Sequence, residues 1–266
     1  YKLTPKVGPI LLDRDIVPSS VAPSKCDPAY FAAGRVRALR KKEIKALEQQ
    51  FIDAAVRVQK AGCDGVELHS AHGYLLQQFL SPVTNQRTDE YGGPLENRCR
   101  FIVNILKGIK EKCGKDFPVI VRLSADECYR YIGQEGKGYT LAEGVKIAKI
   151  LEANGADAID VSSAGYDTFN YWLEPVSFEP GWRKFMAKAI KEAVSIPVLA
   201  ANLIRSPEQA EAQLQEGVQD FICLGRPHIA EPHWANKVLS GEGTVKRCIC
   251  CLNCIESMQN NAYLGS

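Results

Sequence analysis

Short apolar runs alternate with longer helical patterns from residue 42 onward, and this alternation limits the fold more than any other feature of the sequence. Each run is rich in β-branched residues and apolar on both faces, which is typical of parallel strands covered by helices. The spacing of roughly 30–40 residues between runs fits successive strand–helix units of a TIM-type barrel. The runs predict five strands, at Gly65–His69, Pro118–Leu123, Ala158–Ser162, Ile196–Ala201 and Asp220–Leu224.

Apolar residues at helical spacing predict the helices that connect and follow these strands. They cover Lys42–Ala61, Leu95–Cys113, Leu141–Ala153, Trp182–Ala193, Pro207–Glu216 and Pro232–Leu239. A closed barrel has eight strands, and the Pro- and Ser-rich stretch Tyr1–Arg40 could hold one more at most. Either the sheet is open, or the chain lacks the first strands. The expected fold class is α/β, a TIM (β/α)8 barrel without its first strands, over residues 1–245.

The composition excludes several classes of protein. Hydrophobic residues make up 45% of the 266 residues and charged residues 24%, as in ordinary globular proteins. The formal net charge is only +2 and no basic run appears, so we expect no nucleic-acid partner. The longest apolar runs, such as Ala156–Val161, are too short to span a bilayer, so we expect no membrane partner. Prolines and charges interrupt Tyr1–Asp15, which argues against a signal peptide.

Four of the ten cysteines crowd together near one end of the chain, at Cys248, Cys250, Cys251 and Cys254. Such clustering favours a metal or cluster site in a reducing compartment over a disulfide framework, and we expect the cytoplasm. Cys248, Cys251 and Cys254 have the spacing of ligands to an iron–sulfur cluster or a tetrahedral zinc, with Cys250 as the bystander. A fourth ligand could lie beyond the sequence, and four ordinary buried cysteines are the alternative. Residues 246–266 are therefore expected to hold the start of a cysteine motif for an iron–sulfur cluster or a zinc ion.

The last two predicted strands end in small residues followed by polar ones, Ala201-Asn202 and Gly225-Arg226. Phosphate is often held at this place in a barrel. Small residues let backbone N–H groups approach an anion, and an arginine supplies a bidentate positive charge. The sequence therefore predicts a phosphate site. The alternative is that Gly225 turns the chain and Arg226 makes a surface salt bridge.

Arg122 lies at the end of an otherwise apolar strand. One interpretation pairs it with a buried carboxylate. The other places its guanidinium beside the pyrimidine edge of a flavin, where a cation stabilises the reduced, anionic ring.

His69, His72 and Tyr74 follow the first predicted strand. Two imidazoles three residues apart can both donate N–H bonds to one carbonyl oxygen, which polarises a conjugated C=C bond. A nearby phenol can then deliver a proton to the other carbon. Zinc binding is a competing interpretation, although the helical spacing and third ligand of a zinc motif are not evident. Histidines that simply satisfy a strand end are a third.

Taken together, these residues resemble the Old Yellow Enzyme family, and specifically its iron–sulfur branch related to bacterial 2,4-dienoyl-CoA reductase. The stretch Ala61–Cys99 resembles the family signature almost continuously. Also similar are PVIVRLS at Pro118–Ser124, IPVLAAN at Ile196–Asn202 and FICLGRP at Phe221–Pro227, and the cysteine run resembles the cluster motif of that branch.

The resemblance implies a role for each site residue. His69 and His72 would bind the substrate carbonyl oxygen, and Tyr74 would donate the proton. Arg122 would contact the ring of FMN. The FMN phosphate would be held by Ala201, Asn202, Gly225 and Arg226. A [4Fe–4S] cluster that passes electrons to FMN would be held by Cys248, Cys251 and Cys254.

The implied reaction is reduction of the C=C bond of a small α,β-unsaturated carbonyl compound, with hydride from FMN N5 and electrons from NAD(P)H. FAD could belong to a C-terminal part absent from this chain. Two alternatives stay open: an amine dehydrogenase of the same flavin and iron–sulfur architecture, and an inactive barrel fragment. The sequence names neither the substrate nor the oligomeric state, and a homo-oligomer is compatible with it.

Overall fold

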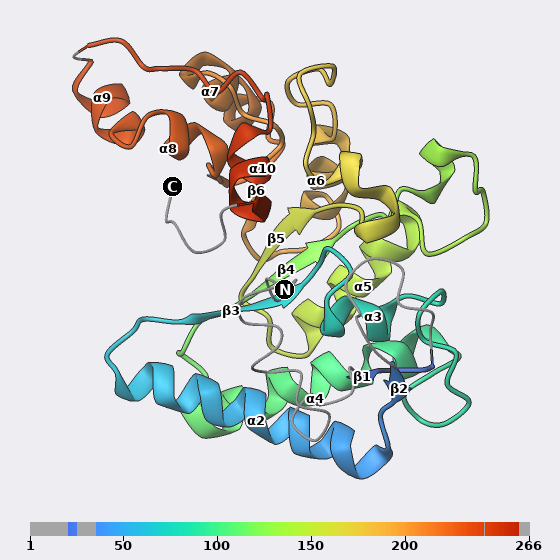
Figure 1. Ribbon diagram of the computed structural model, residues 1–266. Coiled ribbons are helices and arrows are strands. Elements are labelled where there is room, and N and C mark those ends of the chain that lie inside the picture. Colours follow the sequence, from blue (N-terminus) through green and yellow to red (C-terminus); the bar gives the residue numbers. More distant parts are fainter. Residues whose placement is uncertain (1–20, 26–35, 242, 261–266) are drawn as a thin grey trace.

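The computed structural model describes residues 21–25, 36–241 and 243–260. Its centre is a parallel sheet of five strands in sequential order (Figure 1). The strands are β3 (Val66–Ser70), β4 (Val119–Ser124), β5 (Ala158–Ser162), β6 (Val198–Ala200) and β7 (Phe221–Ile222). All five predicted strands are thus confirmed. In the described part of the chain, β3 and β7 each pair on one side only, so the sheet is an open arc.

The six predicted helices are present with ends shifted by no more than two residues. They are α2 (Lys41–Lys60), α4 (Leu95–Cys113), α5 (Leu141–Ala153), α6 (Lys184–Lys191), α7 (Pro207–Gln215) and α9 (Trp234–Ser240). The structure adds short elements that the sequence did not predict: β1 (Val21–Ala22), β2 (Arg37–Ala38), α3 (Leu75–Leu80), the 3-10 turns η1 (Tyr129–Ile132) and η2 (Tyr166–Tyr171), α8 (Arg226–Ala230) and α10 (Asn253–Asn260).

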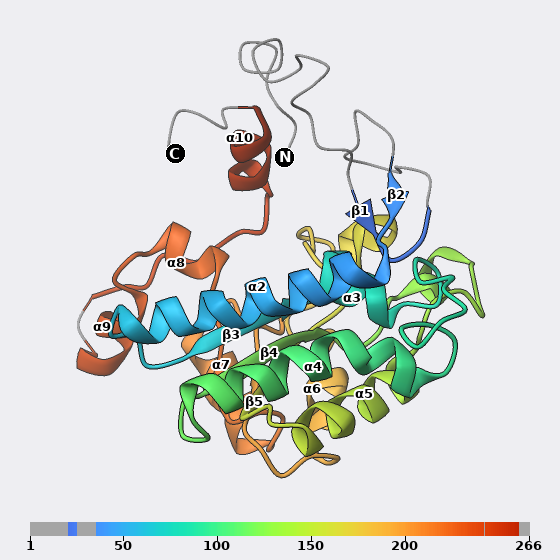
Figure 2. The ribbon, with the colours of Figure 1, turned by 90° about the horizontal axis from the view of Figure 1, so that it is seen from below.

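The helices cover one face of the sheet. Helices α2 and α4 lie side by side, and α4, α5 and α6 follow one another across the strands (Figure 2). Helices α7, α8 and α9 group together at one end of the molecule (Figure 1). Helix α7 begins where Ser206 accepts a hydrogen bond from the N–H of Gln209, with Pro207 in its first turn, a combination that favours helix initiation.

The hydrophobic core lies between these helices and the covered face of the sheet. In β4 the alternate residues Val119, Val121 and Leu123 are fully buried. Phe79 and Phe101 meet them from the helix layer, with ring centroids 4.4 Å apart. The opposite face of β3 and β4 carries charged residues that are not fully buried, so these two strands are apolar on one face and not, as predicted, on both.

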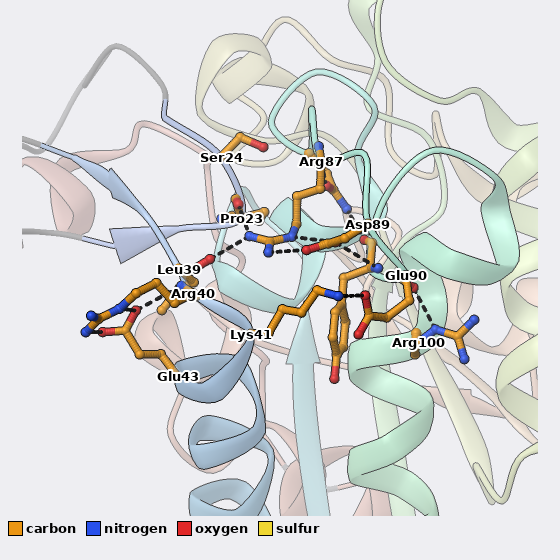
Figure 3. A network of polar contacts seen from close by, with 12 residues as sticks. Pro23, Ser24, Leu39, Arg40, Lys41, Glu43, Arg87, Asp89, Glu90 and Arg100 are labelled. Atoms are coloured by element: carbon orange, nitrogen blue, oxygen red, sulfur yellow. Dashed lines mark hydrogen bonds and ion pairs between the residues drawn. The ribbon is translucent and has the colours of Figure 1, made fainter.

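Arg87 connects the long loop between α3 and α4 to the N-terminal part of the chain by hydrogen bonds (Figure 3). Its Nη1 donates to the main-chain carbonyls of Pro23 and Leu39, both at 2.7 Å. Its Nε and Nη2 donate to the two oxygens of Asp89, at 2.9 and 2.5 Å. This loop therefore has a structural role, with its arginine committed to backbone carbonyls and a neighbouring carboxylate. No helix among the described residues has the length and apolar character needed to cross a membrane.

Candidate active site

His69, His72 and Tyr74 come together at the carboxyl end of β3. The His69 ring centroid lies 5.1 Å from that of His72 and 5.0 Å from that of Tyr74. The chain turns sharply here, since His72 and Gly73 both have positive φ angles, 61° and 78°. Tyr74 keeps 45% of its surface exposed, so its phenol is open to a substrate or to water.

His72 is buried, and its ring contacts Ser162 and Trp172. It is 3% exposed, its Nε2 lies 2.6 Å from Ser162 Oγ, and its ring stacks on Trp172 at 4.2 Å and 13°. Burial, aided by the positive charges of Arg122 and Arg183 and by His69, lowers the pKa of His72 to about 2. The imidazole is therefore neutral and has a single N–H. A substrate oxygen that approaches Nε2 competes with the hydroxyl of Ser162.

A second phenol, which the sequence did not single out, contacts Tyr74. Tyr166 lies edge-on to Tyr74 with ring centroids 5.7 Å apart, and the two hydroxyls share a hydrogen bond. Burial and this bond raise the pKa of Tyr166. Gly73 makes room for Tyr166, because a Cβ at that position would lie 2.8 Å from the tyrosine ring. Its position in the sequence could have marked Tyr166 as a site residue, because it follows the carboxyl end of β5, and catalytic residues of barrels lie at the carboxyl ends of the strands.

A cavity of about 380 Å³ lies beside this cluster, with Trp172 in its wall. It brings together most of the predicted cofactor residues, namely Arg122, Ala201, Gly225 and Arg226, and also Cys248. Asn202 lies behind the wall instead. Its side-chain amide donates to Gln213 and Gln219, and it is almost fully buried. Four of the five predicted cofactor residues therefore share one pocket.

Arg122 pairs with a carboxylate, as one of the two sequence interpretations expected. Its Nε lies 3.1 Å from Asp160 Oδ2. That nitrogen is nevertheless without a hydrogen bond among the described residues, because the contact has ionic distance but poor alignment. Burial raises the pKa of Asp160 while Arg122 opposes the rise. Glu67 lies near the same pair, and burial together with the charge of Asp160 raises its pKa as well.

Arg226 also has a carboxylate partner. Its Nη2 lies 2.9 Å from Glu174 Oε2 and its Nη1 donates to the Glu174 carbonyl at 2.7 Å. Arg226 thus makes a salt bridge, as the alternative interpretation of the sequence expected, but its partner carboxylate is buried and does not lie at the surface. No local sequence pattern pointed to Glu174.

The three predicted cluster ligands are not gathered around one point. Cys248 lines the cavity, Cys251 is exposed, and Cys254 is half-buried. Cys250, the predicted bystander, is buried in the cavity wall, with its N–H 3.4 Å from Cys248 Sγ. Over residues 21–25, 36–241 and 243–260, no group of three or more His, Cys, Asp or Glu side chains could hold a metal ion. This arrangement fits neither the iron–sulfur cluster nor the zinc alternatives.

The chain is similar to known proteins over most of its length. The chain is 46% identical over 237 residues to an NADH oxidase of Thermoanaerobacter brockii, covering 88% of this chain and 35% of that protein. It is 36% identical over 258 residues to a cinnamate reductase of Clostridium sporogenes, covering 92% and 39%. The structure of histamine dehydrogenase from Rhizobium sp. 4-9 superposes with a TM-score of 0.81 at 35% identity, covering 91% and 34%.

The chain therefore spans little more than a third of the length of these relatives. Their similarity and the five parallel strand–helix units confirm the prediction of a TIM-type barrel fold, whose strands in the described residues form an open sheet. The model of one protein family matches residues 7–244, nearly the whole chain. The chain belongs to the NADH:flavin oxidoreductase / NADH oxidase family, also called the Old Yellow Enzyme family, as its sequence motifs predicted.

Proposed function

We propose that this chain is the FMN- and substrate-binding part of an NAD(P)H-dependent ene-reductase, which reduces the C=C bond of a small α,β-unsaturated carbonyl compound. The observation that supports this most directly is that Trp172 contacts both parts of the site, the cluster of His69, His72 and Tyr74 and the cavity beside it. Its ring stacks on His72 and also forms part of the cavity that holds Arg122 and Arg226. The cinnamate reductase among the relatives, named for an unsaturated acid, supports this substrate class.

The cavity residues fit FMN. A Cβ built on Gly225 meets nothing within 4 Å, so the space beside it is open. Arg122 brings a positive charge with an unsatisfied Nε to the place proposed for the flavin ring. In this proposal Ala201, Gly225 and Arg226 hold the phosphate, and Asn202 supports them from behind. FMN held here and reduced by NAD(P)H would supply the hydride for the β-carbon of the activated C=C bond.

The chain's own residues bind the carbonyl and move the proton. His69 and the neutral His72 donate N–H bonds to the substrate oxygen, which strengthens the polarisation of the C=C bond. Tyr74 gives the proton of its hydroxyl to the α-carbon. His72 contributes only when the substrate replaces Ser162 at Nε2. Because His72 carries no positive charge, it acts as a hydrogen-bond donor and not as an acid.

We keep the [4Fe–4S] cluster as a separate proposal that rests on the spacing of Cys248, Cys251 and Cys254 in the sequence. The proposed reaction does not use this cluster, since the three thiols are not gathered for a metal among the described residues. FAD in a further part of the protein is likewise a proposal. The nine cysteines of the described segments are all free thiols, which supports a reducing compartment such as the cytoplasm.

The test is an anaerobic assay of the full-length protein with cinnamate and NADH or NADPH, together with flavin, iron and sulfide analysis. We expect bound FMN, reduction of cinnamate, and loss of at least two orders of magnitude in kcat for Tyr74→Phe, the usual size of a general acid's contribution. A protein that holds flavin but reduces enones equally well without the Tyr74 hydroxyl contradicts the assigned proton donor. A protein that holds no flavin contradicts the function as a whole.

Oxidation of an amine is the second candidate, and the likeness to histamine dehydrogenase favours it. An amine substrate offers no carbonyl oxygen, so the His69 and His72 donors would have no acceptor to polarise. Parallel assays with histamine and with cinnamate separate the two functions.

A further inference from the structure

Glu174 lies between two arginines, the buried Arg183 and the half-buried Arg226. Its Oε1 lies 2.9 Å from Arg183 Nη1 and accepts a 3.0 Å hydrogen bond from the indole N–H of Trp182. Its Oε2 lies 2.9 Å from Arg226 Nη2. The exposed fractions of the three charged side chains are 1% for Glu174, 5% for Arg183 and 14% for Arg226. One carboxylate therefore neutralises two guanidinium groups away from water.

The charges around this cavity do not balance, because its wall carries three arginines, Arg122, Arg183 and Arg226, and two carboxylates, Asp160 and Glu174. Arg183 Nη1 also donates to Ser163 Oγ at 3.1 Å and to the Tyr171 carbonyl at 3.4 Å, whereas its Nε is buried without a hydrogen-bond partner among the described residues. All three side chains line the cavity that also contains Ala201 and Gly225. A buried positive charge in excess of its partner is costly unless a further anion compensates it. The cavity is thus prepared for an anion of higher charge than a carboxylate.

We propose that Arg183 and Arg226 together form the binding site for a phosphate monoester, and that Glu174 fills this site until the phosphate replaces it. The inference rests on the proposed function, because the phosphate is that of FMN. A phosphate monoester carries close to two negative charges and three acceptor oxygens, so it matches two guanidinium forks better than Glu174 does. Arg183, which no sequence motif marked, becomes a phosphate ligand equal in importance to Arg226.

Glu174 then sets the affinity for the cofactor. Before the phosphate can bind both arginines, the carboxylate must give up its contacts with them, and the free energy of those contacts is subtracted from that of binding. The segment that carries Glu174 reaches the surface two residues later, where Val176 is 64% exposed.

The decisive variant is Glu174→Gln in the full-length protein, with Glu179→Gln as the control because Glu179 is exposed on the same segment. The flavin-free protein is titrated with FMN and, separately, with riboflavin, which has the same ring but no phosphate. We expect the Kd for FMN to fall at least tenfold in Glu174→Gln, with the Kd for riboflavin within about twofold of wild type. An unchanged or weakened affinity for FMN, or an equal gain for both flavins, overturns the proposal.

A second measurement does not depend on Glu174→Gln folding. Inorganic phosphate, at constant ionic strength, is expected to raise the Tm of the flavin-free wild type, because a ligand that binds only the folded state stabilises it. Arg183→Gln is expected to abolish that rise and to weaken FMN binding at least tenfold while sparing riboflavin. A phosphate effect that survives Arg183→Gln rejects Arg183 as a ligand. Wild type that responds to phosphate but binds no FMN contradicts the proposed function and leaves the phosphate site supported.

Discussion

Glu127 makes the stability of this protein depend on pH in a direction opposite to that of most carboxylates. It follows β4, is 6% exposed, and its Oε2 accepts hydrogen bonds from Ser81 Oγ at 3.0 Å and from the Tyr139 N–H at 2.8 Å. Burial raises its pKa from 4.5 to about 7, against the effect of these bonds. The folded state therefore binds the proton of Glu127 more tightly than the unfolded state does.

The sign and size of the effect follow from these two pKa values. Below pH 4.5 the carboxyl is protonated in both states, so its burial carries no penalty for charge. As the pH rises from 4.5 to about 7, the unfolded state gains a free energy advantage that is complete above 7. The pKa values differ by about 2.5 (7 − 4.5), and at 1.36 kcal/mol per pKa unit the loss of stability is about 3 kcal/mol.

Glu127→Gln removes the titration while keeping an acceptor for Tyr139. We expect the variant to be as stable as wild type near pH 4, and more stable by up to about 3 kcal/mol near pH 8.5. Denaturant unfolding at both pH values, followed by tryptophan fluorescence, measures the difference. Glu135→Gln, at an exposed position, is the control. If Glu127→Gln loses as much stability as wild type between the two pH values, the assignment of the buried charge is wrong.

Three further predictions follow from single contacts. Tyr166→Phe is expected to lower kcat about tenfold with little change in KM, because a hydrogen bond to the ionising Tyr74 hydroxyl is worth about 1.5 kcal/mol or more; Tyr171→Phe, on the same turn, is the kinetic control. Gly144→Ala is expected to destabilise the fold by about 1–3 kcal/mol in a denaturation experiment, since its Cβ overlaps a main-chain carbonyl of the loop after β4. Arg87→Met is expected to cost about 3 kcal/mol, measured in the same way, because two carbonyls and a carboxylate lose their donor.

The periodic parts of the fold could be predicted from the sequence. Strands such as β5 and helices such as α4 and α5 match their predicted bounds residue for residue, because each carries a repeated apolar pattern. Helices α3 and α8 were missed because they have six and five residues, too few for a helical period to appear. Their existence depends on packing that no local pattern records.

The sequence predicted which candidate site residues would lie together better than it predicted their contacts. Arg122, Gly225 and Arg226 share one cavity, since parallel strands place their carboxyl ends at one edge of the sheet. The carboxylate between the arginines, Glu174, lies 52 residues from Arg226 in the chain. Ser162 is 90 residues from His72. Pairings over such separations depend on the packed fold, and a single sequence contains no periodic signal for them.

The stacking of Trp172 on His72 also has a thermodynamic consequence. One face of the indole supports the imidazole at 4.2 Å, while the same side chain forms part of the cavity wall. A molecule that draws His72 away from Ser162 changes that wall, and a molecule that fills the cavity changes the support of His72. Under the proposed function the two binding events are linked, and linkage is reciprocal: whatever factor the cofactor applies to substrate affinity, the substrate applies to cofactor affinity. Trp172 is the side chain that would carry this coupling free energy between the histidine cluster and the cavity.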